Sequence, residues 1–339
     1  MEAMYTEPWM ISQGPVDLVA GGGRPVMVAF DIDGVILRGG SLLPGASRAV
    51  EDVLARGLLL RFVTNNSTRH RSEVAAKLAG LGLPVRADMV LTSAVATAAW
   101  LVARLGLGAR VLVVGGSGLV RELAEAGLDP VHARGDAEVL SAEAVEAAEA
   151  ATSAPHVPPA AAESSVARSA ADVPSAAVRP AAAQPAAVAV GLDVGFDYQT
   201  LATAQEALLT DALFVATNID ATFPVEDRLL PGGGAIVAAL ATASGREPVV
   251  IGKPESGLAE ALVAEAGGRA GSILFVGDKL NTDIEMASRA GMRSALVLTG
   301  VTERSELEAP GASQPDFVLE TLEELPDLLD RLCAGPVLR

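Results

Sequence analysis

The sequence predicts an α/β fold in which parallel strands form a sheet covered by helices on both faces. Short apolar runs rich in β-branched residues recur along the chain, and a segment of about ten residues with helical spacing follows most of them. The run that begins at Met27 is apolar at four successive positions, as in a strand buried on both faces. Strands that alternate with helices in this way are typical of parallel sheets.

Each expected strand rests on a short, mostly β-branched apolar run, and each expected helix on apolar residues three and four positions apart. The expected strands, in chain order, are Val26–Phe30, Leu58–Val63, Arg110–Val114, Ala187–Gly191, Leu213–Ala216, Pro248–Ile251, Ile273–Val276 and Ser294–Leu298. The expected helices are Gly45–Ala55, Arg71–Leu81, Ala94–Leu105, Leu119–Ala126, Leu201–Leu209, Gly234–Ala243, Leu258–Ala266 and Thr282–Ala290.

Two segments depart from this alternation. Residues 1–24 lack periodicity and end in a glycine-rich stretch, so a flexible lead-in is expected. Residues 141–186 are rich in alanine and proline and contain no glycine or aromatic residue, which favours a disordered insertion in a loop. A surface loop without function is the simpler interpretation of this insertion, and a docking segment is the alternative.

Composition narrows the class of protein. The 339-residue chain is long enough for two domains, and its formal net charge of −17 disfavours nucleic acid and anionic membranes as partners. The single cysteine, Cys333, forms no intramolecular disulfide, which fits a reducing compartment. The longest uncharged run, Leu229–Gly245, is short for a bilayer span and contains proline and glycine. Because no basic stretch follows Met1, no signal peptide is expected, and the protein is predicted to be cytoplasmic.

Paired acids follow the first strand, in the stretch "MVAFDIDG". Asp31 and Asp33 lie two positions apart, so in an extended segment both side chains point to the same side. Open α/β sheets place ligands at the carboxyl ends of their strands. Because two carboxylates this close repel each other, the pair requires a cation, or a proton held at a shifted pKa. Taken alone, the stretch is equally well explained as a solvated turn.

Three further stretches place polar residues after a predicted strand. Thr64 and Asn65 follow the strand in "FVTNNSTR", and Lys253 follows the strand in "VVIGKPES". Asp278 follows the strand in "ILFVGDKLNTD", and Asp283 lies at the start of the next helix. Each stretch has a simpler explanation by itself: a helix N-cap, a solvated lysine in a turn, and an acid that complements a helix dipole.

Together the four stretches predict one site, because the carboxyl ends of parallel strands share one edge of a sheet. That edge would hold several carboxylates, one lysine and one hydroxyl. Carboxylate ligands suit Mg²⁺, which keeps water and substrate phosphate in its coordination shell, and the lysine and hydroxyl suit a phosphoryl group. An aspartate beside Mg²⁺ can attack phosphorus as a covalent nucleophile.

A glycine-rich stretch at Val111–Val120, "VLVVGGSGLV", is similar to a nucleotide-binding turn. Arg121 occupies the position of the third glycine in that motif, however, so the match is incomplete. A tight turn between a strand and a helix is the expected structure there.

The four stretches occur in the order "DIDG", "TNN", "GKP" and "GDKLNTD", and this order resembles the motifs of the haloacid dehalogenase-like (HAD) hydrolase superfamily. The stretches "LLPGA", "ATNID", "PGGGA" and "LVLTGV" extend the resemblance to subclass IIA. This branch holds NagD-type nucleotidases and the p-nitrophenyl, phosphoglycolate, glycerol-3-phosphate and pyridoxal phosphatases. The resemblance covers residues 25–335 apart from the insertion, and it implies a Rossmann-like parallel-sheet core with an inserted α/β cap domain of the C2 type.

The resemblance also implies domain boundaries. The core would comprise residues 25–92 and 248–339, and the cap, which contains the insertion, residues 93–247. Because such a cap closes over the site and selects the substrate, Asn218 and Asp220 are candidates to face it; the alternative is that both only satisfy a turn. The cap is also a candidate surface for a homodimer.

The implied catalytic roles follow from the motif positions. Asp31 corresponds to the nucleophile, and Asp33 to the general acid that protonates the leaving alcohol and then acts as base toward water. Thr64, Asn65 and Lys253 correspond to the groups that bind the phosphoryl oxygens.

The implied cofactor is Mg²⁺. Its ligands would be the Asp31 carboxylate, the Asp33 backbone carbonyl and Asp278, with Asp283 supporting them from behind.

The expected function is a Mg²⁺-dependent phosphatase that acts on a small phosphate monoester through an aspartyl-phosphate intermediate. p-Nitrophenyl phosphate, phosphoglycolate and glycerol 3-phosphate are the expected kinds of substrate, and nucleoside monophosphates or pyridoxal phosphate are the alternatives. A phosphotransferase that passes the phosphoryl group to a sugar and a non-catalytic phosphate-binding protein are the alternative functions.

Overall fold

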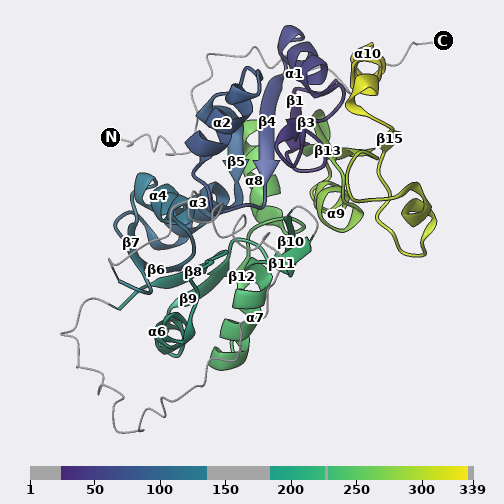
Figure 1. Ribbon diagram of the computed structural model, residues 1–339. Helices are drawn as coiled ribbons and strands as arrows, with labels where there is room; N and C mark the ends of the chain where they lie inside the picture. The colour runs from purple at the N-terminus through teal and green to yellow at the C-terminus, as the bar shows by residue number, and fades with distance from the viewer. Residues whose placement is uncertain (1–23, 136–183, 226–227, 335–339) are drawn as a thin grey trace, which may run out of the picture.

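The computed structural model describes residues 24–135, 184–225 and 228–334. Nearly all of the expected lead-in at residues 1–24 and of the insertion at residues 141–186 lies outside these ranges. Within them the chain forms two parallel sheets flanked by helices, one in the upper and one in the lower half of Figure 1. The predicted α/β class, with a Rossmann-like parallel sheet, is confirmed.

The first sheet has six strands in the order β15-β14-β13-β1-β4-β5, and all its pairings are parallel. Its strands are β1 (Met27–Asp31), β4 (Leu59–Thr64), β5 (Val90–Thr92), β13 (Ile273–Gly277), β14 (Arg293–Val297) and β15 (Phe317–Leu319). The central strands β13, β1 and β4 are buried along their whole length. This burial explains their nearly continuous apolar sequences.

The second sheet has five strands in the order β12-β9-β8-β6-β7, again with every pairing parallel. Its strands are β6 (Arg110–Val114), β7 (Asp129–His132), β8 (Ala187–Val190), β9 (Leu213–Ala216) and β12 (Val249–Val250). Two antiparallel hairpins accompany the sheets: β2 (Leu37–Arg38) with β3 (Ser41–Leu42), and β10 (Thr222–Val225) with β11 (Arg228–Pro231).

Helices follow most strands, as the sequence predicts. They are α1 (Ala46–Ala55), α2 (Arg71–Gly80), α3 (Ser93–Leu105), α4 (Ser117–Glu125), α6 (Tyr198–Leu208), α7 (Gly233–Ser244), α8 (Ser256–Glu265), α9 (Glu285–Arg289) and α10 (Leu325–Cys333). A short π-helical turn, η4 (Leu280–Ile284), precedes α9. Over the described part of the chain, no helix is both long and apolar enough to cross a membrane.

Apolar clusters show which helices cover which face of each sheet. Helices α1, α2 and α10 pack against the face of the first sheet that carries Val28 and Phe30. Helices α3, α8 and α9 cover the opposite face, which carries Met27 and Ala29, and this cluster continues into β6, β8 and α4. Helices α6 and α7 cover the far face of the second sheet. One apolar cluster therefore extends from the first sheet to the second, and each sheet has a separate cluster on its other face.

The strands that the sequence did not predict are short. Strands β5, β7 and β15 contain three or four residues each, and β7 lies at a sheet edge and contains Pro130, a residue confined to edge strands. Helix α10 and the two hairpins were also not predicted. The expected turn between Val114 and the following helix is confirmed, because α4 begins at Ser117.

One strand lies in a different sheet from the one expected. The strand expected at Pro248–Ile251 is reduced to β12, which pairs with β9 through Val249 and Val250. Its carboxyl end was expected at the edge of the sheet that holds β1, and this placement is wrong, because β12 hydrogen-bonds to the second sheet. The core and cap boundaries stay a prediction, but β12 itself belongs with the strands expected in the cap.

Candidate active site

Three adjacent strands of the first sheet end in polar residues at one edge. Asp31 is the last residue of β1 and Thr64 the last residue of β4, while Asp278 directly follows β13. Because these strands are parallel neighbours, their carboxyl ends lie together. The structure therefore brings three of the predicted site residues to one place.

Lys253 reaches the same place from the second sheet. Its Nζ lies 2.5 Å from Asp31 Oδ1 and 2.7 Å from Asp283 Oδ1, and only 4% of the residue is exposed. The chain crosses from the second sheet to the first just after β12. The side chain is thus delivered to the carboxylates although its strand is not part of the first sheet.

The side chain of Asn65 holds the main chain of Lys253. Its Oδ1 accepts the Lys253 backbone N–H at 2.8 Å, and its Nδ2 donates to the Lys253 carbonyl at 3.0 Å and to Asp220 Oδ2 at 3.2 Å. The oxygen and the nitrogen of the Asn65 side-chain amide are therefore both hydrogen-bonded to protein atoms. The structure assigns Asn65 a positioning role toward the lysine, and direct contact of its side chain with a phosphoryl oxygen stays a prediction.

Asn218 and Asp220 form part of the same junction. Asn218 Nδ2 donates to the Asn65 carbonyl at 2.8 Å, and its Oδ1 accepts the Asp220 backbone N–H at 3.1 Å. Asn218 is buried, whereas Asp220 is half-buried. The turn that they satisfy lies against the Thr64–Asn65 segment, and contact of either residue with substrate stays a prediction.

Three buried carboxylates, of Asp31, Asp278 and Asp283, offer one oxygen each within 4.8 Å of one another. Asp283 Oδ2 accepts the backbone N–H groups of Asp278 and Lys279, both at 3.1 Å, so this side chain braces the start of the turn. Asp278 Oδ2 accepts the Val301 backbone N–H at 2.8 Å. The other oxygen of Asp278, Oδ1, is buried without a hydrogen-bond partner among the described residues.

The residues around this carboxylate cluster fit a divalent metal ion. A buried carboxylate oxygen without a partner is costly unless a cation meets it. Gly34 has a φ of +88°, and a Cβ there would lie 2.2 Å from Asp278 Oδ2, so only glycine allows this main chain to approach the carboxylate. A donor set of carboxylates suits Mg²⁺, because this ion prefers oxygen ligands.

Burial and mutual repulsion shift the pKa values of this cluster. Burial raises the pKa of Asp31 well above its usual value, and Asp283, Asp278 and Asp33 add to the rise against the opposing effect of Lys253. Burial, followed by repulsion from Asp283, raises the pKa of Asp278 to about 6. Burial alone would lower the pKa of Lys253, but the carboxylates of Asp283 and Asp31 hold it above its usual value. The cluster carries excess negative charge that a cation would offset.

Asp33 lies outside β1, whereas Thr64 ends β4 as the sequence predicts. Asp33 lies beyond the end of β1, in a turn closed by a bridge to Leu37, and it is exposed while Asp31 is buried. Asp33 is therefore not part of the strand that ends at Asp31, and its facing the same site as Asp31 stays a prediction. An exposed carboxyl beside a buried one can still exchange protons with water. Thr64 Oγ1 accepts the Asn66 backbone N–H at 3.1 Å.

Sequence reasoning missed several residues that shape the site. Ser93 Oγ donates to the Asn65 carbonyl at 2.6 Å, and Thr299 Oγ1 donates to the Gly34 carbonyl at 2.8 Å. A Cβ at Gly300 would lie 2.0 Å from Asp278 Oδ2. Thr299, Gly300 and Val301 lie in the stretch "LVLTGV", which only the family resemblance identified in the sequence. The residue types themselves did not indicate that they contact the site.

A cavity of about 260 Å³ lies apart from the carboxylate cluster, between α3 and α8. Its lining is mostly apolar and includes Trp100, and none of the predicted catalytic residues contributes to it. The predicted catalytic residues therefore lie apart from this cavity.

Comparison with known proteins agrees with the geometry. A family model described as haloacid dehalogenase-like hydrolase matches residues 28–129, and a second model of the same kind matches residues 250–325. D-glycerol 3-phosphate phosphatase of Mycobacterium tuberculosis is 36% identical over 87% of this chain and 69% of its own length. Phosphoglycolate phosphatase 2 of Arabidopsis thaliana is 31% identical over 89% of this chain and 92% of its own.

A solved structure shares the fold. The crystal structure of glycerol phosphate phosphatase from Mycobacterium tuberculosis in complex with magnesium has a TM-score of 0.70 to this chain at 34% sequence identity. The match covers 90% of this chain and 78% of that one. The similarity therefore extends over both sheets, and the second sheet corresponds to a cap domain.

The chain belongs to the haloacid dehalogenase-like hydrolase family. Within it, the chain falls in the branch of the glycerol-3-phosphate, phosphoglycolate and p-nitrophenyl phosphatases, as the motifs predict. The protein is a phosphoric monoester hydrolase.

Proposed function

We propose that this enzyme hydrolyses phosphate monoesters of small metabolites through a phosphoryl-enzyme intermediate on Asp31, with Mg²⁺ as cofactor. The observation that carries the proposal is the buried cluster in which Asp31 and Asp283 flank Lys253 Nζ while Asp278 Oδ1 lacks a partner among the described residues. Excess buried negative charge of this kind supports binding of a divalent cation together with a phosphoryl group.

The protein groups divide the chemistry between them. An Asp31 carboxylate oxygen attacks phosphorus, a new P–O bond forms, and the bond from phosphorus to the leaving oxygen breaks. Asp33 gives its proton to that oxygen, then takes a proton from the water that attacks the phosphoryl group and restores the Asp31 carboxylate. Lys253 Nζ balances charge on the phosphoryl oxygens, and Thr64 supplies a hydroxyl at the same edge.

The metal ion would be held by the Asp31 carboxylate, the Asp33 main-chain carbonyl and Asp278. When bound, it supplies charge neutralisation that lets an anionic carboxylate approach an anionic phosphate. Asp283 would hold the Asp278 main chain and Lys253 in place from behind. The close approach of Gly34 to Asp278 supports this arrangement, because it puts the neighbouring Asp33 main chain beside the carboxylate.

The substrate class rests on the relatives. The similarity to proteins named glycerol 3-phosphate phosphatase and phosphoglycolate phosphatase supports a small, acyclic alcohol phosphate. Nucleoside monophosphates and pyridoxal phosphate remain the alternative substrates. The relatives named as phosphatases disfavour the two alternative functions, a phosphotransferase and a non-catalytic phosphate-binding protein. A cytoplasmic location and a homodimer formed through the cap are part of the proposal.

The test is an assay of the purified protein on a panel of phosphate esters with Mg²⁺, with EDTA and with Ca²⁺. We expect release of phosphate from phosphoglycolate or glycerol 3-phosphate with Mg²⁺, loss of turnover with EDTA, and full recovery on Mg²⁺ addition. Ca²⁺ should restore little activity, because its larger and looser coordination misplaces the nucleophile relative to phosphorus. Full activity after rigorous chelation, or no turnover of any ester, would contradict the proposal.

A further inference from the structure

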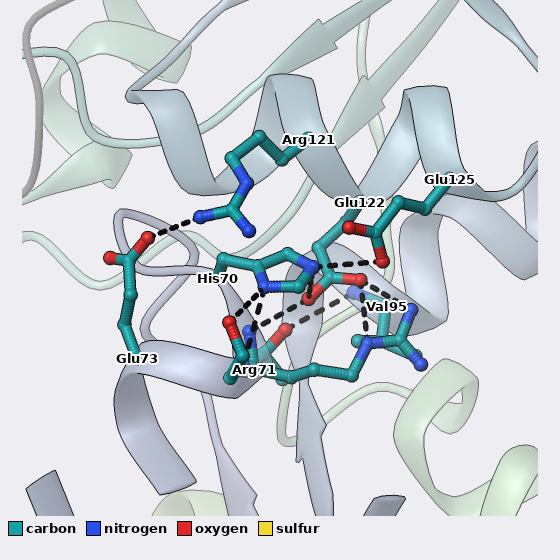
Figure 2. A network of polar contacts seen from close by, with 9 residues as sticks. His70, Arg71, Glu73, Val95, Arg121, Glu122 and Glu125 are labelled. Atoms are coloured by element: carbon teal, nitrogen blue, oxygen red, sulfur yellow. Dashed lines mark hydrogen bonds and ion pairs between the residues drawn. The ribbon is translucent and has the colours of Figure 1, made fainter. Parts of the chain in front are cut away.

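A second buried charged network joins the two sheets, and none of its residues has a part in the mechanism proposed above (Figure 2). Its centre is Glu122 on α4, whose side chain is completely buried. The Arg71 backbone N–H donates to Glu122 Oε1 at 2.8 Å, Arg71 Nε donates to Oε2 at 2.8 Å, and Arg71 Nη2 also contacts Oε2. Arg71 is the first residue of α2, so the pair ties a helix of the second sheet to a helix of the first.

His70 completes the network. Its Nε2 lies 3.0 Å from Glu125 Oε2 and 3.4 Å from Glu122 Oε1. On the other side of the ring, the Ser72 backbone N–H donates to Nδ1 at 3.3 Å, and the Ser72 hydroxyl lies 2.7 Å from the same nitrogen. A neutral imidazole whose Nδ1 accepts a hydrogen bond carries its proton on Nε2, which lies near both carboxylates without a hydrogen bond to either.

The contacts of His70 and Glu122 distinguish two interpretations of the network, a metal site and a set of ion pairs that clamps the two helices together. A histidine and two glutamates at this spacing can hold a divalent metal ion. A metal ion would need the Nε2 lone pair, whereas Ser72 places the proton there, and Arg71 already occupies both oxygens of Glu122. The wholly buried charge, that of Glu122, is balanced by the Arg71 guanidinium, while Glu125 is half exposed to water. The observations favour an ionic clamp.

The clamp holds the segment that follows the phosphate-binding edge. Gly118 at the start of α4 donates its backbone N–H to the Thr68 carbonyl at 3.1 Å. A Cβ at Gly118 would lie 2.4 Å from the Arg69 carbonyl carbon, so only glycine permits this contact. Ser67 Oγ lies 3.0 Å from Thr217 Oγ1. Residues from the second sheet and its helices thus contact the stretch 65–71 at both ends and between them. Asn218 binds Asn65 at one end, and Glu122 binds Arg71 at the other.

We propose that Glu122 is a positioning residue, which couples the orientation of the second sheet to the segment that carries Thr64 and Asn65. The coupling passes to Lys253, because Asn65 binds the main chain of that lysine. This inference rests on the proposed function, since its readout is ester hydrolysis. The nucleophile, the acid–base residue and the predicted metal ligands lie on the first sheet, so loosening the clamp weakens substrate binding more than it slows the chemical step.

The test compares two charge-neutralising variants on the same pair of helices. Glu122→Gln removes the buried charge. Glu73→Gln removes the exposed ion pair in which Arg121 Nη1 lies 2.6 Å from Glu73 Oε1. For the best ester of the panel, Glu122→Gln should raise KM about tenfold and leave kcat within about threefold. Glu73→Gln should change both by less than about twofold, because exposed pairs contribute little.

Outcomes of this comparison are decisive in both directions. A KM within twofold of the parent in folded Glu122→Gln, or equal effects of the two variants, would overturn the proposal. If the parent enzyme hydrolysed no ester of the panel, that result would contradict the proposed function instead, so the two failures are distinguishable. A tightly bound transition metal that disappears in Glu122→Gln but not in Asp31→Asn would replace the clamp by a metal site.

A measurement on the parent enzyme covers the case in which Glu122→Gln does not fold. Inorganic phosphate with Mg²⁺ serves as the probe, and amide hydrogen exchange is followed with and without it. If the clamp couples the two layers, the probe slows exchange in residues 117–125 as well as in residues 64–71, because coupling between sites is reciprocal. Slowing confined to residues 64–71 would overturn the proposal.

Discussion

At the edge of the first sheet, the carboxylates of Asp31, Asp278 and Asp283 are buried around one lysine. At the junction of α2 and α4, the buried carboxylate of Glu122 is paired with Arg71, whose guanidinium donates to Oε2 and whose backbone N–H donates to Oε1. The first cluster is left with excess negative charge and a raised pKa at Asp31 and Asp278, whereas the second is matched charge for charge. A buried cluster whose charges are unmatched is suited to bind a ligand, and one whose charges are matched is suited to hold structure.

The largest effect should come from Asp31→Asn. The amide has nearly the same shape as the carboxylate but cannot attack phosphorus, so kcat should fall by several orders of magnitude. The variant should be at least as stable as the parent, because it removes a carboxylate whose pKa is raised by burial. Steady-state kinetics and thermal unfolding check the two parts, and turnover within about tenfold of the parent would be incompatible with a nucleophilic role.

Asp33→Asn should have a smaller but still large effect on an ester with a poor leaving group. General acid–base catalysis contributes roughly 10²–10⁴-fold, and kcat should fall by that factor. Because Asp33 is exposed, folding stability should change little. Unchanged hydrolysis of glycerol 3-phosphate or phosphoglycolate would show that another group moves the protons.

A matched pair outside the site should affect stability without affecting catalysis. Arg61 Nε lies 2.5 Å from Glu265 Oε2, and both side chains are largely buried. Arg61→Met leaves a buried unpaired glutamate and should lower the free energy of unfolding by about 3–5 kcal/mol. Urea denaturation measures this change, while kcat of the folded variant should stay within about threefold of the parent.

The control for this pair removes both charges. The double variant Arg61→Met with Glu265→Leu should recover most of the lost stability, because no unpaired charge remains in the interior. If the double variant is as unstable as the single one, packing of the arginine stem and not the ion pair explains the loss.

The smallest effect concerns pH and the metal. In the metal-free protein the folded pKa of Asp278 is about 6, above its ordinary value of 3.8, so its contribution to stability is fully present below pH 3.8 and is lost as pH rises through 6. Mg²⁺ binds the deprotonated carboxylate, so it should stabilise most above pH 6. Saturating Mg²⁺ should raise Tm by roughly 5 °C at about pH 7.5 and by less than half of that at about pH 5. An equal shift at both pH values, or the same pH dependence in Asp278→Asn, would argue against metal binding at this carboxylate.

The sequence predicted the parts of this molecule that depend on local pattern. β-Branched apolar runs predicted the central strands. The position of Asp31, Thr64 and Asp278 at the ends of these strands predicted that the three residues are neighbours. Short elements such as β5, β7 and β15 were missed, because three or four residues do not establish a period. The family motifs supplied the roles that spacing alone left open.

Features that depend on tertiary contacts could not be predicted. The strand before Lys253, β12, belongs to the second sheet only because of its hydrogen bonds to β9. The exposed Asp33 is separated from the buried Asp31 only by the turn that follows β1. The Arg71–Glu122 pair joins residues 51 positions apart, and neither residue lies in one of the motifs. A local pattern carries no signal for contacts of this range.

The central claim is that the unmatched carboxylate cluster forms a covalent phosphoryl-enzyme on Asp31, and trapping that species tests it most directly. Asp33→Asn should be mixed with Mg²⁺ and p-nitrophenyl phosphate, quenched in acid and digested for mass spectrometry. The activated leaving group needs no acid, whereas hydrolysis of the intermediate needs the base, so one phosphoryl group should accumulate on the peptide that contains Asp31. Asp31→Asn under the same conditions should carry none. A phosphoryl group on another residue, or none in a variant that still releases p-nitrophenol, would contradict the account.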